Sequence, residues 1–462
     1  MKFLPLNVVA AALLSALCYS ANSHAQSIEQ RLSALEQRLS ELEKQLAAKD
    51  KKIAALEREQ KRTQVVANNA KVSAIEAQQV LFNDTTRPSH RFAAPTKSIR
   101  LSDSTTTLQL GGQIWLDAIY NHGEMTNRAG FQTSSIAYDD NTTNDNTLLS
   151  AGQSKLSFRS HTPTHYGDMT TRFEFDMFDD QGNADFHLTH LWGELGNWGA
   201  GQTFSGFMDI NSFPNIIDYW GPTAMVFTRQ PQIRYRTEQS ASGATWMVTM
   251  ERSDADLAFP RDIDPATLSF NEQNDWPDAT LSYQQRFTDG YIKAALLLRS
   301  LGFETSTQED SVTGWGINVT GNYALDKAHL LKFQFATGEG IARYINDPCC
   351  SIYSAITGGS DAGLNSNGDL QAIGISGGFV YLDKQWSERF TSSLGVSYVD
   401  VDNLATQHAR AFNNSLYSTI NLIWNPTMMS RLGVELQYGE VENFAGEQAD
   451  NLRLQTSFGF KY

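Results

Sequence analysis

The sequence lacks three features that would mark common classes of protein. It has only three cysteines in 462 residues, so a small fold held together by many disulfides is excluded. After an N-terminal leader it has no apolar run of about 18 residues, the shortest length that crosses a membrane as a helix. Basic residues are scarce beside acidic ones, and the net charge of -15 argues against nucleic-acid binding.

The leader has the pattern of a secretory signal peptide. Lys2 precedes an apolar core at residues 8–17, and residues 23–25 (Ser-His-Ala) form a cleavage site of the A-x-A type. The core is too short to span a bilayer as a helix. We therefore predict that residues 1–25 are removed on export and that the mature chain begins at Gln26.

The two cysteines of the predicted mature chain, Cys349 and Cys350, are adjacent. Neighbouring cysteines rarely form an unstrained disulfide. A strained bridge between them, a bridge to another chain, and two unbonded loop thiols are all compatible with an exported protein. No cluster of metal-type ligands accompanies them, so the sequence predicts no metal site there.

Residues 27–60 differ from everything that follows. They contain no glycine or proline, and their apolar residues recur in alternating steps of four and three, which is the heptad pattern of a coiled coil. The alternative is a lone charged helix, but a row of leucines exposed to water is unfavourable. The predicted coiled-coil core consists of Ile28, Leu32, Leu35, Leu39, Leu42, Leu46, Ile53 and Leu56.

Charges beside this core indicate how the helices associate. A residue at heptad position g meets position e of the next heptad in a parallel neighbour. The resulting pairs are of opposite charge, which favours identical chains packed in parallel: Arg31–Glu36, Arg38–Glu43 and Lys52–Glu57. We predict a periplasmic coiled coil over residues 26–80, followed by a polar linker at residues 81–107.

From residue 108 to residue 462 the apolar residues follow a period of two, which indicates β-strands. In residues 171–178, for example, apolar side chains alternate with Arg172, Glu174 and Asp176. A soluble sandwich also alternates, but here charges lie at mid-strand and apolar faces often end in Tyr, Trp or Phe, as at a membrane interface. Sheet edges cannot lie in lipid. We therefore predict an all-β fold, a transmembrane antiparallel β-barrel of about 16 strands over residues 108–462.

The last segment, RLQTSFGFKY, fits this barrel. Phe458 and Phe460 share one parity and are predicted to face lipid, and Tyr462 is predicted to lie at the periplasmic rim. A terminal aromatic residue resembles the signal by which barrel-assembly machinery recognises outer-membrane proteins. Connections alternate between short and long, which puts short turns in the periplasm and long loops outside. A barrel of about 16 strands leaves room for water, so a channel is expected.

One long connection, residues 203–231, is unusually apolar and aromatic and contains Pro214 and Pro222. A loop of this composition would be poorly soluble if it were fully exposed to water. Folding back into the barrel would bury its apolar side chains. We therefore predict that this segment narrows the channel as a constriction loop.

Arginines near this loop are the candidate selectivity residues. Guanidinium groups in a narrow, partly desolvated passage favour anions and bind carboxylates in a bidentate manner. The alternative is that they pair with nearby carboxylates and brace the loop, and both roles can hold together. The candidate cations are Arg159, Arg172, Arg229, Arg234 and Arg236, and the candidate carboxylates are Glu174, Asp176, Asp209 and Asp218.

The run GQTFSGFMD…FPNIIDYWGP…RQPQIRY, within residues 201–236 and behind a signal peptide and heptads, resembles the DcaP-like porins of Gram-negative outer membranes. The resemblance implies a trimeric porin with an N-terminal periplasmic coiled coil. It also implies a preference for small anionic solutes such as dicarboxylates. The implied pore role carries over to Arg159, Arg172, Arg229, Arg234 and Arg236. The loop at residues 355–370 has no counterpart that we can assign in that family.

Catalytic and metal-binding patterns are weak. GISGG at residues 374–378 matches G-x-S-x-G, but it lies in an alternating strand and not in a strand-to-helix turn, so Ser376 is expected to face the lumen. His187 and His190 are three residues apart, which would put them on opposite faces of a strand. We predict no metal site, no cofactor and no enzymatic activity.

The prediction is a homotrimeric diffusion channel of the outer membrane, in contact with the lipid bilayer, that passes small hydrophilic, anionic solutes. Two alternatives remain open. One is a structural anchor whose coiled coil reaches toward the cell wall, and the other is a barrel enzyme. Conductance of the purified protein would separate a channel from both. The sequence leaves open the identity of the solute, the oligomeric state and whether residues 338–370 gate the channel.

Overall fold

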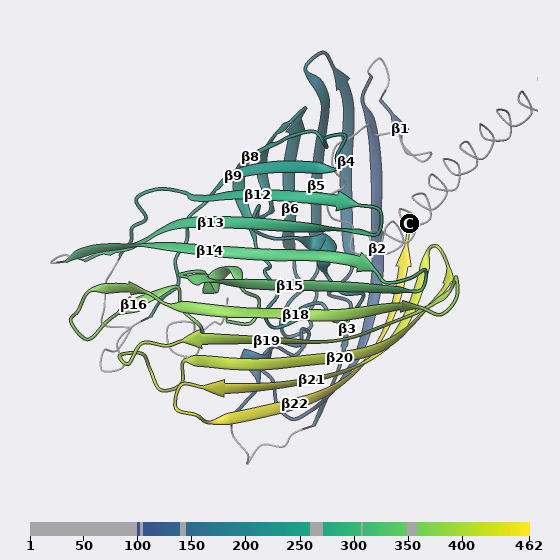
Figure 1. Ribbon diagram of the computed structural model, residues 1–462. Helices are drawn as coiled ribbons and strands as arrows, with labels where there is room; N and C mark the ends of the chain where they lie inside the picture. Colours follow the sequence, from purple (N-terminus) through teal and green to yellow (C-terminus); the bar gives the residue numbers. More distant parts are fainter. Residues whose placement is uncertain (1–98, 102–104, 139–144, 259–270, 306–307, 349–357) are drawn as a thin grey trace, which may run out of the picture. The chain divides into compact units, whose positions relative to one another are not determined.

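The computed structural model describes residues 99–101, 105–138, 145–258, 271–305, 308–348 and 358–462 (Figure 1). The predicted signal peptide and the predicted coiled coil, with its core residues, lie outside these ranges, as do Cys349 and Cys350. All of the structural statements below concern the described residues.

The described residues form a closed barrel of 16 antiparallel strands, in which β3 and β4 are two pieces of one interrupted strand. Successive strands are hydrogen-bonded neighbours, and the last strand closes the barrel on the first through pairs from Gln113–Lys461 to His122–Leu452. This confirms the predicted all-β fold, an antiparallel barrel of about 16 strands. The wall strands are β2 (Thr107–His122), β3 (Asn146–Ser150), β4 (Lys155–Thr164), β5 (Gly167–Asp176), β6 (His187–Leu195), β7 (Trp198–Phe204), β8 (Arg229–Arg236), β9 (Ala244–Glu251), β12 (Asp278–Phe287), β13 (Gly290–Glu304), β14 (Glu309–Ala324), β15 (His329–Glu339), β18 (Gly374–Gln385), β19 (Phe390–Asp402), β20 (Phe412–Thr427), β21 (Ser430–Asn443) and β22 (Gln448–Lys461).

The two faces of the wall have opposite polarity, as the period of two predicts. Ile114 and Phe460 point outward and are more than half exposed, whereas Gln437 and Arg453 point inward and are fully buried. A soluble domain would have the reverse arrangement. An apolar outer face and a polar interior are what a wall surrounded by lipid requires.

The connections differ in length at the two rims. At one rim, called the short-turn rim, they are residues 165–166, 196–197, 237–243, 288–289, 325–328, 386–389 and 428–429. The other rim, called the long-loop rim, carries long connections that include residues 205–228, 252–277 and 340–373. The long-loop rim also has a short connection, residues 444–447, so the predicted alternation of short and long connections holds only in part.

Exposed aromatic side chains gather in pairs near the short-turn rim. Trp198 packs against Tyr235 with ring centroids 4.9 Å apart, and Phe390 stacks on Trp424 at 6.1 Å. Aromatic rings are favoured where a bilayer meets water. Tyr462 lies at the same rim, where its backbone N–H donates to the carbonyl of Gly112.

Short elements complete the described part of the chain. A small sheet formed by three short strands lies in the long connections of the long-loop rim. None of the described residues forms a helix that is long and apolar enough to cross a membrane. The short elements are β1 (Ile99–Arg100), β10 (Leu257–Ala258), β11 (Asn271–Glu272), β16 (Ala362–Leu364), β17 (Leu370–Ala372), and the 3-10 turns η1 (Thr133–Ser135), η2 (Ile210–Ser212) and η4 (Ala342–Tyr344).

Two expectations about side-chain direction were wrong. Ser376 shares its parity with the exposed Val380, whereas a side chain at Gly377 would meet Ala224 inside the barrel, so Ser376 faces outward. The error arose because Ile375 is apolar yet points inward, where it is buried against the loop that fills the lumen. An apolar residue therefore does not mark the lipid face wherever a loop covers the inner wall.

The second error concerns the histidines. The pairing of β5 with β6 shifts by one residue between Glu174 and Phe175, which is a β-bulge. Because the bulge adds a residue, His187 and His190 both point inward. His187 Nδ1 lies 2.8 Å from Asp176, and His190 is fully buried. Sequence spacing alone cannot locate such a bulge.

Candidate pore lining and inward loop

Residues 205–228, called the inward loop, connect β7 to β8 and lie inside the barrel. Phe207 and Val226 of this loop are fully buried. They belong to one hydrophobic cluster with inward side chains of the wall such as Phe379 and Tyr417. Burial of this apolar segment removes it from water, which is the reason that the sequence predicts a loop folded inward.

Two wall lysines hold the backbone of the inward loop. Lys293 on β13 donates to the carbonyl of Met208 at 2.5 Å. Lys332 on β15 donates to the carbonyl of Phe213 at 2.6 Å and forms an ion pair with Asp383 at 3.0 Å. Both lysines are buried. Because a buried carbonyl needs a donor, these ammonium groups replace the water that the loop loses.

Two arginines also donate hydrogen bonds to oxygen atoms at the inward loop. Arg431 on β21 donates to the side-chain oxygen of Asn215 at 2.9 Å and to the carbonyl of Ile216 at 3.3 Å. Arg234 on β8, a predicted pore residue, is 6% exposed and donates to the carbonyl of Phe204 at 2.6 Å. The structure therefore places Arg234 at the base of the inward loop.

Wall carboxylates hold the N–H groups of the same loop. Glu435 on β21 accepts from the backbone N–H of Ile217 at 2.9 Å and of Asp218 at 3.1 Å. Glu251 on β9 accepts from the N–H of Gly206 at 2.7 Å. The wall thus satisfies both the donors and the acceptors of a buried loop backbone.

The two candidate carboxylates within the loop also anchor it. Asp209 accepts from the hydroxyls of Tyr291 at 2.9 Å and of Thr320 at 2.6 Å. Asp218 accepts from the Tyr417 hydroxyl at 3.2 Å. These contacts tie the loop to β13, β14 and β20. Both carboxylates contribute to loop placement.

Strands β4 and β5 carry a separate set of charged residues that point into the lumen. Glu174 accepts from Arg172 at 2.8 Å and lies 3.6 Å from the ammonium of Lys155. Arg159 is the cross-strand partner of Arg172. The inward loop does not bury these cations fully, because Lys155, Arg159 and Arg172 all keep part of their surface exposed. We call this region, together with Arg229, the open wall.

Asp176 connects the open wall to the inward loop. It accepts from the hydroxyl of Tyr219 at 2.8 Å, and His187 lies at the same distance. Burial, reinforced by the charge of Asp176, raises the pKa of Tyr219 well above its usual value. Tyr219 therefore keeps its proton and remains a donor to Asp176.

Arg229 begins β8 and lies between two aromatic rings. Its guanidinium carbon is 5.0 Å from the ring centre of Phe204 and 4.7 Å from that of Phe227. This cation–π contact holds the group in place while leaving it half-buried. The charged groups that line the adjacent cavity of about 150 Å³ are Lys155, Glu174, Asp176, Asp218, Arg229 and Arg431.

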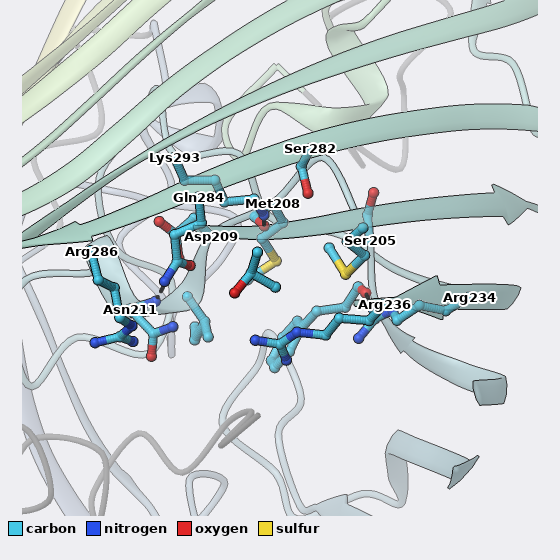
Figure 2. A pocket seen from close by; sticks show the side chains of 14 residues that line it. Ser205, Met208, Asp209, Asn211, Arg234, Arg236, Ser282, Gln284, Arg286 and Lys293 are labelled. Atoms are coloured by element: carbon cyan, nitrogen blue, oxygen red, sulfur yellow. Dashed lines mark hydrogen bonds between the residues drawn. The ribbon is translucent and has the colours of Figure 1, made fainter. Parts of the chain in front are cut away.

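A second, smaller cavity contains the other two predicted arginines. Arg234 and Arg236 extend into it from β8, with Arg286 and Lys293 from β12 and β13 (Figure 2). The carboxylate of Asp209 faces the same space. Of the predicted arginines, Arg229 therefore lines the first cavity and Arg234 and Arg236 line the second, while Arg159 and Arg172 lie on the open wall outside both linings.

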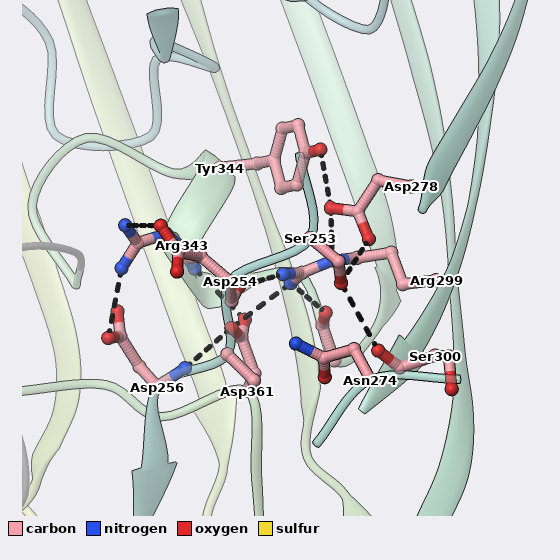
Figure 3. Close-up of polar contacts among 12 residues, drawn as sticks. Ser253, Asp254, Asp256, Asn274, Asp278, Arg299, Ser300, Arg343, Tyr344 and Asp361 are labelled. Atoms are coloured by element: carbon pink, nitrogen blue, oxygen red, sulfur yellow. Dashed lines mark hydrogen bonds and ion pairs between the residues drawn. The ribbon is translucent and has the colours of Figure 1, made fainter. Parts of the chain in front are cut away.

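A charged brace lies at the long-loop rim, outside both groups (Figure 3). Arg299 is fully buried and pairs with Asp278 at 2.9 Å and with Asp361 at 3.0 Å. Arg343 pairs with Asp256 at 3.1 Å. Burial beside Asp361 raises the pKa of Asp256. The brace joins the β9–β12 connection to the β15–β18 connection.

Several lumen residues were missed from the sequence. Each has the parity opposite to an apolar strand face, which is the signal that could have identified it. A run of wall strands offers many such positions, and only contact with the loop distinguishes them. The missed residues are Lys155, Arg286, Lys293, Lys332 and Arg431. Within the described residues, no three His, Cys, Asp or Glu side chains are grouped to hold a metal ion.

A model of the DcaP outer membrane protein family matches residues 32–457. The chain belongs to this family. It is therefore an outer-membrane protein, and its barrel is of the porin type. Among curated proteins, none matches the sequence.

Solved structures support this DcaP-family assignment at the level of fold. The outer membrane channel DcaP of Acinetobacter baumannii is 19% identical, with a TM-score of 0.67, over 79% of this chain and 99% of that one. An anion-selective porin from Comamonas acidovorans is 11% identical, with a TM-score of 0.51, over 77% of this chain and 100% of that one. At these identities the comparison concerns the barrel alone.

Proposed function

We propose that this protein is a diffusion channel that favours small anionic solutes such as dicarboxylates. The observation that carries the proposal is the excess of half-buried cations on the open wall. Lys155, Arg159, Arg172 and Arg229 face the lumen there, against Glu174 and Asp176 on the wall and Asp218 of the inward loop at the adjacent cavity. Charges in a narrow, partly desolvated passage act more strongly than in water.

The inward loop supports the same reading. It occupies the lumen beside β13 to β22, so a solute would pass between the loop and the open wall. Guanidinium groups bind carboxylates through two parallel hydrogen bonds. Several such groups along one wall suit a solute that carries two carboxylates. The loop sets the size limit in this proposal, and the open wall sets the charge preference.

The test is the reversal potential of single channels in a potassium chloride gradient. Replacing Arg159 and Arg172 together by glutamine should reduce the anion preference several-fold, because two lumen charges are lost. The permeability of succinate relative to chloride should fall with it. The matched control is Arg389→Gln, an exposed arginine in a short turn. A double variant with the reversal potential of the control would reject the proposal.

We further propose that three chains assemble, with the segment at residues 26–80 forming a parallel coiled coil in the periplasm. The heptad pattern and the paired charges in the sequence support this. Light scattering of the detergent-solubilised full chain should give a trimer. A variant lacking residues 26–80 should dissociate at a protein concentration at which the full chain is still trimeric. A full chain that is monomeric would contradict it. A non-conducting trimer would instead favour the anchor that reaches toward the cell wall.

A further inference from the structure

The smaller cavity lies between the first residues of the inward loop and the wall strands β8, β9, β12 and β13 (Figure 2). Its volume is about 60 Å³. Arg236 and Arg286 stand at the ends of β8 and β12, next to the short turns 237–243 and 288–289. The cavity is therefore close to the short-turn rim, and it differs from the larger cavity at Lys155 and Glu174.

Four polar side chains of this cavity have no partner among the described residues. The guanidinium of Arg236, the hydroxyls of Thr245 and Ser282 and the amide of Gln284 all line it, and none forms a hydrogen bond or ion pair with another described side chain or backbone group. Thr245 is 8% exposed and Ser282 is 3% exposed. These four polar groups are therefore available to ordered water or to a ligand that enters the cavity.

The neighbouring charged groups are already in use. Lys293 donates to the carbonyls of the inward loop, and Arg234 donates to the base of that loop. Asp209 accepts from Tyr291. The guanidinium of Arg286 lies 5.5 Å from the centre of the same tyrosine ring. Arg236 is thus the cation that remains to meet a ligand, and the other cations add to the positive field around it.

We propose that this cavity binds a small tetrahedral oxyanion, inorganic phosphate or sulfate. Its donors come from four strands and converge from several directions, which suits an anion with acceptor oxygens on all sides better than a planar carboxylate. A space of this size holds roughly a few water molecules, so it admits a compact ion. The inference rests on the proposed anion permeation, since the ion reaches the cavity through the lumen.

The experiment measures chloride current through single channels while phosphate is added to one side and then to the other. Phosphate should block at a lower concentration from one side, because the cavity lies near one rim. Arg236→Gln should weaken that block by about tenfold or more, the effect of losing one charge-assisted contact. Ser282→Ala, a small change inside the wall, should weaken it less. Arg236→Lys should restore part of it.

Two controls separate this inference from the proposed function. Arg159 lies on the open wall and does not line the smaller cavity, so Arg159→Gln should lower anion preference without changing the phosphate block. Arg236→Gln should change the block more than the reversal potential. Equal phosphate block in Arg236→Gln and the unmodified protein, or no block from either side, would overturn the oxyanion site while leaving the anion preference intact. Sulfate in place of phosphate should give the same ranking of variants.

Discussion

The lumen of this barrel contains two kinds of cation that differ in what they contact. On the wall covered by the inward loop, Lys293, Lys332 and Arg431 are at most 7% exposed and donate to loop oxygens. On the open wall, Arg159 and Arg172 remain half-buried and face the lumen. Both kinds occupy inward positions of the same two-residue period. The comparison shows that coverage by a loop, more than residue type or parity, decides whether a lumen cation donates to the loop or keeps part of its surface exposed to the lumen.

The cost of burial explains the difference. A charge removed from water is destabilising unless hydrogen bonds and an opposite charge compensate it. Lys332 has both, from Asp383 and from the loop carbonyl of Phe213. Arg172 pairs with Glu174, and 12% of its side chain stays exposed, so its burial is less complete than that of Lys332.

The largest expected effect comes from removing a lysine that the inward loop covers. Lys332→Ala would leave Asp383 buried without its partner, which typically costs about 3–5 kcal/mol. The midpoint of thermal unfolding in detergent should fall, and the inward loop should become sensitive to protease. Lys327→Ala, an exposed lysine in the turn before β15, is the control. Equal unfolding midpoints and equal protease sensitivity in the two variants would contradict a stabilising role for Lys332.

The next prediction sharpens the comparison between two neighbouring arginines. Arg234→Ala removes the donor to the Phe204 carbonyl, and loss of a charged hydrogen bond of this kind costs about 1.5–3 kcal/mol. Unfolding temperature and unitary conductance should both change. Arg236→Ala should alter ion selectivity with little loss of stability. If Arg236→Ala destabilises the protein as much as Arg234→Ala does, the proposed difference between a stabilising Arg234 and a solute-contacting Arg236 is wrong.

A smaller change is expected at the open wall. Glu174→Gln removes the negative charge beside Arg172 and Lys155, so the local field becomes more positive. Anion preference from reversal potentials should rise by about two- to fivefold, since a net charge near the passage is worth about 0.5–1 kcal/mol in such a partly wet site. Glu388→Gln, an exposed glutamate in a short turn, should have no such effect. A fall in anion preference would be the contrary result.

The smallest effect concerns pH. Burial raises the pKa of Asp347, in the β15–β18 connection, to about 6, despite donors from Thr133 and Thr223, with Asp218 adding repulsion. Trp220 also donates to it. A carboxyl with a raised pKa in the folded state binds protons more readily there than in the unfolded chain, so stability rises as pH falls from 7.5 to 5.5, by about 1 kcal/mol.

The check for this last prediction is the unfolding temperature in detergent at both pH values. Asp347→Asn should remove that part of the pH dependence and leave the rest. The difference between the unmodified protein and the variant isolates Asp347 from other acidic groups with raised pKa, such as Asp256 in the brace. An identical slope in both proteins would show that Asp347 does not titrate in this range.

Much of the wall follows from short-range sequence pattern. The alternation in Leu454, Phe458 and Phe460 against Arg453 predicts which face meets lipid, and the structure has the same arrangement. The apolar composition of residues 203–231 predicts a loop that avoids water. The pattern was misleading at Ile375, where the interior is apolar because the loop packs there.

The candidate site was only partly predictable. Parity put Arg159, Arg172, Arg234 and Arg236 inside the barrel, but it could not tell that Arg234 is buried at the base of the loop while Arg236 lines a cavity. That distinction depends on where the loop docks. The contacts that dock it join residues far apart in the chain, and no local pattern records them.

The sequence by itself determined the barrel, because the two-residue period and the polarity of each face are local properties of the chain. Tertiary structure alone decided which lumen charges are bonded to the inward loop and which keep part of their surface exposed to the lumen. The physical reason is that a charge takes its role from the groups that replace its water, and those groups come from distant strands and from the loop that folds between them.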